Sequence, residues 1–267
     1  MAPANRSHFQ SKWHASPGTV EYHRLYDECY FRDYLPEYES AAFRQRRVMY
    51  RQEYERITRY IRSGRVLDVG CGCGDFLELF TPSRWERFGM EVAPVALEVL
   101  DAHGIQTDLA GMPDESFDLV IFRGTIQHLD EPITTIKRCI RWLHAGGYMV
   151  FLATPNIGSL YYRLFQELPA IDPPRNFMQV SDRILQGILE NLGMEVLRFE
   201  FPYRGTPYAR PIRDAFSFVL RFLGVRRDFA FWGNMLECYA RKPPRPPRQL
   251  ALPSTFAAMC GLILILL

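Results

Sequence analysis

The stretch Val66-Leu67-Asp68-Val69-Gly70-Cys71-Gly72-Cys73-Gly74-Asp75 decides the fold of this chain. Its first four residues are typical of the end of a buried strand that carries one acid. The three alternating glycines predict a tight turn, and residues 76–80 predict a helix after it. Glycine has no Cβ and tolerates positive φ, so a ligand can approach the bare backbone of such a turn. The stretch therefore indicates a nucleotide-type site, without saying which nucleotide.

Length and composition limit the classes of protein to consider. The 267 residues fit one domain with additions or two small ones, and the 48% hydrophobic fraction is that of a folded chain. A net charge of +2 gives no reason to expect a nucleic-acid partner. Six scattered cysteines indicate a reduced, cytoplasmic protein, and the spacing Cys71-x-Cys73 is wrong for a metal site. The polar residues 1–14 predict no signal peptide.

Strand and helix patterns alternate along most of the chain. Strands are expected at 65–69, 85–92, 105–108, 117–122, 148–153, 194–201 and 234–240. Helices are expected at 37–62, 75–80, 93–103, 131–144 and 180–192. The economical arrangement is an α/β fold with a doubly wound, seven-stranded, mostly parallel sheet. Ligands of such sheets bind outside the carboxyl ends of the strands, where Asp68, Glu91 and Asp108 fall.

The residues at these strand ends discriminate between nucleotides. The Gly-x-x-x-x-Gly-Lys-Ser/Thr of phosphate-binding loops is absent, and Gly70-x-Gly72-x-Gly74 differs from the Gly-x-Gly-x-x-Gly of dinucleotide folds. Asp68, beside the turn, disfavours a pyrophosphate but suits a cationic, amino-acid-bearing ligand. Glu91 is suited to accept hydrogen bonds from two ribose hydroxyls, and Asp108 suits an adenine amino group. A ligand with adenine, ribose, an ammonium group and no phosphate is S-adenosylmethionine.

Several segments, in this order, resemble the class I S-adenosylmethionine-dependent methyltransferases. They are the glycine block at 66–74, Gly-Met-Glu-Val at 89–92, Pro-Asp-Glu-Ser-Phe-Asp-Leu-Val at 113–120, Gln-His-Leu at 127–129 and Gly-Gly at 146–147. Residues 154–160 and Asp172-Pro173-Pro174 are similar to a subgroup near the ubiquinone-biosynthesis O-methyltransferases and small-molecule or sugar methylases. The resemblance covers about residues 40–242 and implies a Rossmann-like methyltransferase fold.

The resemblance also implies a cofactor site. Three glycines of the turn, Gly70, Gly72 and Gly74, face the methionine part of S-adenosylmethionine, and Cys71 is also expected to bind the cofactor. Glu91 then holds the ribose, and Asp108 and Leu109 line the adenine. Asp68 either contacts the cofactor or orders the glycine turn through backbone N–H groups.

The acceptor side depends on less familiar residues. Methyl transfer is an in-line displacement from a sulfonium, so the protein must position the acceptor and remove its proton. His128, just after the fourth expected strand, is the candidate base, because histidine can take up a proton near neutral pH. The alternative is that His128 only hydrogen-bonds and packs there. Relatives commonly carry Glu-His at this point; here Gln127 precedes His128 and is a second candidate for acceptor contact.

Arg175 follows Asp172-Pro173-Pro174, where relatives often continue with Glu-His. A cation at the mouth of the acceptor pocket would select an anionic acceptor, such as a carboxylate- or phosphate-bearing sugar or lipid. The alternative is a surface arginine. An insert at 202–233 contains an amphipathic piece, and inserts of this kind cap the acceptor pocket in the family; a membrane-facing or partner-facing helix is an equal alternative.

The two ends of the chain differ from the methyltransferase domain expected at 37–242. Residues 1–36 hold a polar lead and an aromatic run that either packs on the domain or forms a lid. Residues 243–267 form a Pro/Arg-rich linker and an apolar tail, and 250–267 carries no charge. The tail is expected to insert into or lie on a membrane, with the basic linker keeping the domain cytoplasmic. A buried or partner-binding tail is the alternative.

Two functions fit these patterns. The first is S-adenosylmethionine-dependent methylation, at oxygen, of a small-molecule, glycan or lipid-linked acceptor. The second is a non-catalytic methyltransferase-like scaffold, whereas the glycine spacing disfavours a nicotinamide oxidoreductase. The sequence decides neither the acceptor nor the oligomeric state.

Overall fold

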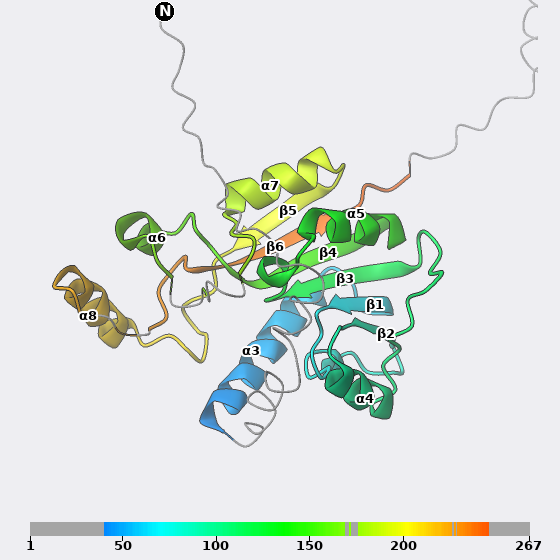
Figure 1. The fold of residues 1–267 in the computed structure, drawn as a ribbon, viewed down its shortest axis with the longest axis horizontal. Coiled ribbons are helices and arrows are strands. Elements are labelled where there is room, and N and C mark those ends of the chain that lie inside the picture. Colours follow the sequence, from blue (N-terminus) through cyan, green and yellow to red (C-terminus); the bar gives the residue numbers. More distant parts are fainter. Residues whose placement is uncertain (1–39, 169–170, 172–175, 226, 228, 246–267) are drawn as a thin grey trace, which may run out of the picture.

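The computed structural model describes residues 40–168, 171, 176–225, 227 and 229–245. Within them, one mixed six-stranded sheet has the order β2-β1-β3-β4-β6-β5 (Figure 1). Its strands are β1 (Gly64–Val69), β2 (Trp85–Met90), β3 (Phe117–Arg123), β4 (Leu143–Pro155), β5 (Glu195–Glu200) and β6 (Met235–Arg241). Strands β1 to β4 run parallel to one another, and β6 runs antiparallel to both β4 and β5. The predicted α/β fold with a mostly parallel sheet is confirmed.

Helices cover both faces of the sheet (Figure 1). They are α3 (Ala41–Ile57), α4 (Pro94–Ala102), α5 (Pro132–Trp142), α6 (Leu160–Phe165), α7 (Asp182–Asn191) and α8 (Pro211–Phe222). Helices α5 and α7 contribute to the core on one face, and α3 and α4 contribute to the core on the other. Helices α6 and α8 pack together at one end of the molecule, away from α4 (Figure 1).

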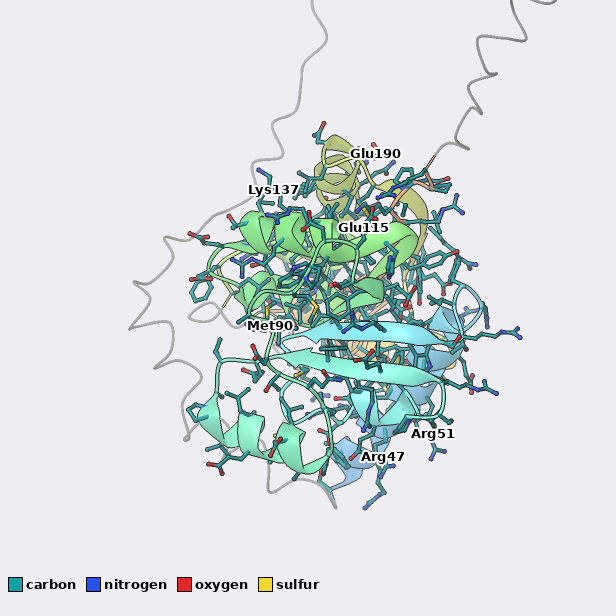
Figure 2. The ribbon with its side chains drawn as sticks, turned by 90° about the vertical axis from the view of Figure 1, so that its right-hand side faces the viewer. Arg47, Arg51, Met90, Glu115, Lys137 and Glu190 are labelled. Carbon is teal, nitrogen blue, oxygen red and sulfur yellow. The ribbon has the colours of Figure 1, made fainter. Side chains whose placement is uncertain are left out.

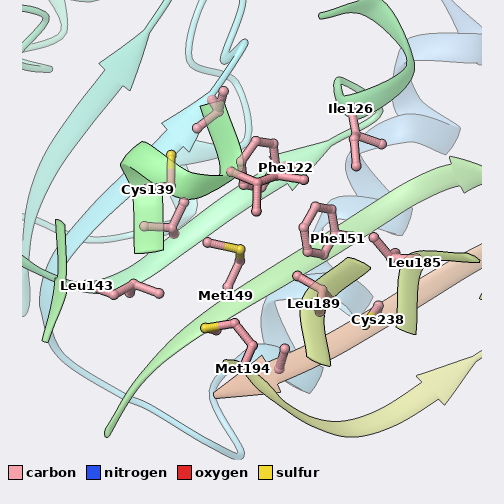
Figure 3. Close-up of a cluster of buried hydrophobic side chains, with 14 of the residues drawn as sticks. Phe122, Ile126, Cys139, Leu143, Met149, Phe151, Leu185, Leu189, Met194 and Cys238 are labelled. Carbon is pink, nitrogen blue, oxygen red and sulfur yellow. The ribbon is translucent and has the colours of Figure 1, made fainter. Parts of the chain in front are cut away.

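The alternation of side chains along the strands fills these two cores. In β3, Val120 and Phe122 point toward α5, whereas Leu119 and Ile121 point toward α3. The Phe122 ring stacks on Phe151 of β4 with 4.9 Å between ring centroids (Figure 3). The same alternation places the acid of β1 and the arginine that ends β3 on the α3 face.

The segment 105–108, expected as a strand, forms a single bridge, in which Gln106 pairs with β2. The carboxylate of Asp108 accepts a hydrogen bond from Ala110 N at 2.9 Å. This side-chain turn diverts the chain from the sheet. The described sheet therefore has six strands, and the prediction of seven was wrong.

Two further boundaries differ from those expected. The helix expected at 75–80 is a short 3₁₀ turn, Leu77–Leu79. The chain between Gly74 and Pro82 is too short for a stable helix, and Pro82 has no N–H to continue one. Strand β4 begins directly after α5 rather than at residue 148, because Leu143 already pairs with Phe117 of β3.

Helix α3 has one solvated face and one face that carries buried charges. Arg47 and Arg51 point outward, as the charge pattern predicted (Figure 2). Arg56 does not: its Nε lies 2.8 Å from Oε2 of Glu237, a fully buried residue of β6. Tyr239 donates its hydroxyl to the same carboxylate oxygen at 2.7 Å. The helix is thus held to the sheet by charge pairing as well as by apolar packing.

Some predicted features lie outside the described residues: the aromatic run before residue 40, Arg175, and the apolar tail 250–267. Among the described helices, none is long and apolar enough to span a bilayer. The domain limits 1–36, 37–242 and 243–267 stay predictions.

Replacing Arg56 with methionine leaves the buried Glu237 carboxylate with the Tyr239 hydroxyl but without its cation. We expect Arg56→Met to lower the free energy of unfolding by about 3 kcal/mol at pH 7, because an uncompensated buried charge is costly. Urea denaturation followed by circular dichroism measures the change. The control, Arg51→Met on the exposed face, should change it by less than about 0.5 kcal/mol. Equal effects of the two variants would contradict a structural role for the pair.

Candidate active site

A cavity of about 190 Å³ opens at the carboxyl ends of β1, β2 and β3. Most of its wall comes from residues that follow these strands, together with Tyr50 of α3 and Met90 at the end of β2 (Figure 2). It brings together these predicted site residues: Asp68, Gly70, Cys71, Gly72, Glu91 and His128. Four other predicted residues do not line it: Gly74, Asp108, Leu109 and Gln127.

The three glycines of the turn have different structural roles. Gly70 has φ +69°, and a Cβ there would lie 2.3 Å from Cγ2 of Thr125, so no side chain fits. Gly72 has φ +55° and no atom within 4 Å of where a Cβ would stand, so its backbone is open to a ligand. A Cβ on Gly74 would lie 2.7 Å from Ile105, which shows that Gly74 permits packing behind the turn.

Glu91 ties the turn to the end of β2. Its Oε2 accepts from Gly72 N at 3.0 Å, and its Oε1 accepts from Val92 N at 2.6 Å and Ala93 N at 3.2 Å. A carboxylate has about four lone-pair positions, so these bonds leave capacity for a diol. Glu91, the residue predicted to bind the ribose, therefore lies in the cavity wall.

Asp68 is the most unusual group of the cavity. The residue is 2% exposed, and its Oδ1 has no hydrogen-bond partner among the described residues. Burial raises the pKa of the Asp68 carboxyl to about 8, with Glu91 and Glu53 adding to the rise and Arg123 opposing it. Because Oδ1 bonds to no backbone N–H, this oxygen does not order the glycine turn. A cationic donor in the cavity would satisfy it.

The structure adds an arginine that the sequence analysis missed. Arg123 ends β3, its Nε lies 2.6 Å from Oε2 of Glu53, and its guanidinium lies 4.1 Å from the ring centroid of Tyr50. Glu53 is fully buried on α3, and burial raises the pKa of its carboxyl although Arg123 opposes the rise. A charged residue directly after an apolar strand was the available signal. The helix that supplies its partner could not be located from the sequence.

His128 lines the cavity and is held by a buried amide. Asn176 Nδ2 lies 3.2 Å from His128 Nδ1, and Asn176 is fully buried. With the amide nitrogen as donor, Nδ1 is the acceptor and the neutral imidazole carries its proton on Nε2. Phe177 N donates to Gln127 O at 2.8 Å and fixes this loop beside the histidine. Asn176, to which the sequence analysis gave no role, thus orients the candidate base.

The remaining predicted residues stand behind the cavity. Gln127 donates to Gly124 O at 2.9 Å and stabilises the turn after β3. Leu109 packs against the core rather than in the cavity wall, and Asp108 is engaged in its own turn. Burial raises the pKa of the Cys71 thiol, and no cluster of metal-ligating side chains occurs among the described residues.

A second cavity, of about 330 Å³, lies beside the first. Arg123 belongs to the walls of both. The second wall is largely apolar and aromatic, from α3, the end of β4 and the insert at 202–233, and includes Met49, Leu168, Tyr203, Tyr208, Phe229 and Phe231. The predicted insert therefore walls a cavity adjacent to the glycine turn.

A model of the methyltransferase domain family matches residues 41–198. The chain belongs to this family. The resemblance inferred from the glycine block is confirmed, and with it S-adenosylmethionine as the cofactor of the family.

Two curated relatives illustrate the similarity. The ubiquinone biosynthesis O-methyltransferase of Xanthomonas oryzae is 32% identical over 108 residues, which cover 36% of this chain and 45% of the relative. The malonyl-[acyl-carrier protein] O-methyltransferase of a Paenibacillus strain is 25% identical over 169 residues, covering 55% of this chain and 61% of the relative. The chain thus spans about half the length of the curated relatives it matches.

Solved structures share the fold. A SAM-dependent methyltransferase from Archaeoglobus fulgidus has a TM-score of 0.52 and 21% identity, covering 78% of this chain and 99% of that one. The geranyl diphosphate C-methyltransferase of Streptomyces coelicolor, solved with S-adenosyl-L-homocysteine, has a TM-score of 0.51 and 12% identity, covering 74% and 81%.

The residues present fit S-adenosylmethionine. The Asp68 carboxyl lines the cavity and can accept from its ammonium group, the open backbone at Gly72 admits its amino-acid part, and Glu91 can accept from ribose hydroxyls. Met90 and Leu129 supply apolar wall nearby.

Cofactor binding should release a proton from Asp68. With a pKa of about 8, this carboxyl is mostly protonated at pH 7, and an ammonium group beside it would lower the pKa. We therefore expect S-adenosylmethionine binding at pH 7 to release up to about one proton, and affinity to increase as the pH rises toward 8. Titration calorimetry in two buffers with different ionisation enthalpies measures the proton count.

The variant Asp68→Asn should release no proton from this position and bind at least about tenfold more weakly, through loss of a charge-assisted hydrogen bond. Asp101→Asn, at an exposed position of α4, is the matched control. Unchanged proton release in Asp68→Asn would contradict the assignment.

Proposed function

We propose that this methyltransferase transfers the methyl group of S-adenosylmethionine to an oxygen atom of a small apolar acceptor bound in the second cavity. The observation that carries the proposal is the meeting of a polar and an apolar cavity at Arg123. Of the acceptor classes that the sequence leaves open, small-molecule, glycan and lipid-linked, the aromatic lining favours an apolar, lipid-linked molecule.

The similarity to relatives supports oxygen as the accepting atom. The two curated relatives described above are both named O-methyltransferases. One name refers to ubiquinone biosynthesis and the other to malonyl-[acyl-carrier protein], so we base the acceptor class proposed for this chain on its own cavity.

Methyl transfer in this site relies on positioning. Bound S-adenosylmethionine supplies a methyl group on a sulfonium, whose thioether leaving group needs no assistance. Asp68 and Glu91 hold the cofactor from two strand ends, and Gly72 leaves room for it. The Glu53–Arg123 pair holds α3 across the boundary of the two cavities. Alignment of acceptor and cofactor across this boundary is the main contribution of the protein to rate.

Two roles can be considered for His128: a hydrogen-bond donor that positions the acceptor, or a general base. The contact with Asn176 distinguishes them. With Asn176 Nδ2 as donor, Nε2 of His128 carries a proton and can only donate to the acceptor, which makes it a positioning group. As a general base, His128 would instead need a free Nε2. The observed contact supports positioning.

We therefore expect His128→Ala to lower kcat by about tenfold, the equivalent of one hydrogen bond. His128→Gln, which retains a donor, should recover much of that loss, and the cofactor Kd should stay the same in both variants. A loss of about 10²- to 10⁴-fold, together with disappearance of the acidic limb of the pH–rate profile, would make His128 the base instead.

The proposed function is tested in two stages. Calorimetric titration with S-adenosylmethionine, S-adenosylhomocysteine and NADH comes first, and no binding of the first two would overturn the proposal. Radiolabelled S-adenosylmethionine is then incubated with the protein and either a total lipid extract or a polar metabolite extract. Label in the organic phase is the expected result; binding without any transfer would support the non-catalytic scaffold.

Phe231→Ala should enlarge the second cavity and raise the acceptor KM by about tenfold, through loss of buried aromatic contact. The cofactor Kd should not change, because Phe231 does not line the first cavity. Leu160→Ala, an exposed position on α6, is the control. A Phe231→Ala effect on cofactor Kd alone would place the acceptor elsewhere.

A further inference from the structure

The inward side of helix α8 combines two buried polar residues with Phe218, whose ring stacks on Phe231, whereas much of its solvent side is apolar. Asp214 is 2% exposed and accepts hydrogen bonds from Tyr203 Oη and Arg210 N, both at 2.8 Å. Ser217 is also buried. The exposed large residues fall three or four apart and form one stripe, here called the α8 face: Ile212, Phe216, Val219 and Leu223. Helices on globular domains normally bury such a stripe.

The exposure of this stripe is large. Ile212 is 90% exposed, Leu223 is 74% exposed and Phe216 is 60% exposed. Trp232, after the helix, is 63% exposed and directly follows Phe231 of the second cavity. Tyr208, before the helix, is both exposed and part of the wall of that cavity. Apolar surface thus borders the second cavity on both sides of α8, at one end of the molecule (Figure 1).

The exposed charged residues just before and at the start of α8 are all cations. Arg204, Arg210 and Arg213 are exposed at the start of the helix. The single carboxylate of α8 within its described residues is the buried Asp214. The surface therefore combines an apolar stripe and aromatic rings with exposed cations, which is the composition of helices that lie in the headgroup region of anionic membranes.

Other occupants fit this surface less well. A second copy related by a two-fold axis would bring the same arginines together, which is unfavourable. The uncharged segment 250–267 of this chain has no anion for them. An anionic bilayer matches both the apolar stripe and the cations.

We propose that the α8 face, with Trp232, docks on the surface of an anionic lipid bilayer and holds the second cavity against it. The docking itself does not depend on the proposed function. Its corollary, that an apolar acceptor enters the second cavity from the lipid, rests on the proposed function.

The test uses the full-length protein and vesicles of phosphatidylcholine with or without about 30% phosphatidylglycerol. We expect flotation with the anionic vesicles, and an at least tenfold loss of partitioning in the double variant Phe216→Asp/Val219→Asp. Arg213→Gln should weaken binding a few-fold on anionic vesicles and leave binding to neutral vesicles unchanged. The matched control is Val48→Asp, an exposed apolar position on α3. All variants should keep the wild-type S-adenosylmethionine Kd, which shows that they are folded.

Trp232 gives a local readout of the same contact. Brominated lipids in the vesicles should quench its fluorescence, and Trp232→Phe should remove that part of the quenching. Wild-type partitioning of the double variant would overturn the proposal and assign membrane binding to another segment. A dimer that the double variant abolishes without any change in flotation would overturn it in favour of a second copy. If the wild-type protein floats with the anionic vesicles but transfers no methyl group, the result would count against the proposed function and not against the docking.

Discussion

The buried ion pair between Glu53 and Arg123 is the contact on which the site depends. It joins α3 to the carboxyl end of β3, and its arginine is shared by both cavities. Such a pair adds little net stability, because desolvation of both charges offsets their attraction. Separating it leaves an uncompensated buried charge, which costs about 3–5 kcal/mol. The pair therefore fixes where α3 lies, and with it the boundary between the two cavities.

Charge balance near this pair favours a cationic ligand. Burial is the main cause of the raised pKa of Asp68, and repulsion from Glu91 and Glu53 adds to it while Arg123 opposes it. A ligand that brings an ammonium and a sulfonium relieves that repulsion, whereas the demethylated product has lost the sulfonium charge. The same repulsion that adds to the raised pKa of Asp68 thus favours binding of S-adenosylmethionine over binding of its demethylated product.

What the sequence predicts well is what local chemistry determines. The glycine spacing and the acid at the end of β2 identify the cofactor loop, because its backbone and Glu91 bond to each other within one βα unit. Contacts between segments that lie far apart in the sequence are harder to predict. The segment at Asp108 resembles a strand end but leaves the sheet through its own side-chain turn, and Arg123 gains meaning only from a helix 70 residues earlier in the chain. Asn176 likewise reaches His128 across 48 residues.

The insert shows a second limit of pattern reading. Its periodicity predicts an amphipathic helix, but periodicity does not say which side is buried. Contacts far along the chain decide this: Asp214 bonds to Tyr203 and to the backbone of Arg210, and the Phe218 ring stacks on Phe231. Residues on both sides of α8 then line the second cavity, while the α8 face stays exposed. One segment consequently shapes both the wall of the second cavity and the exterior surface beside it.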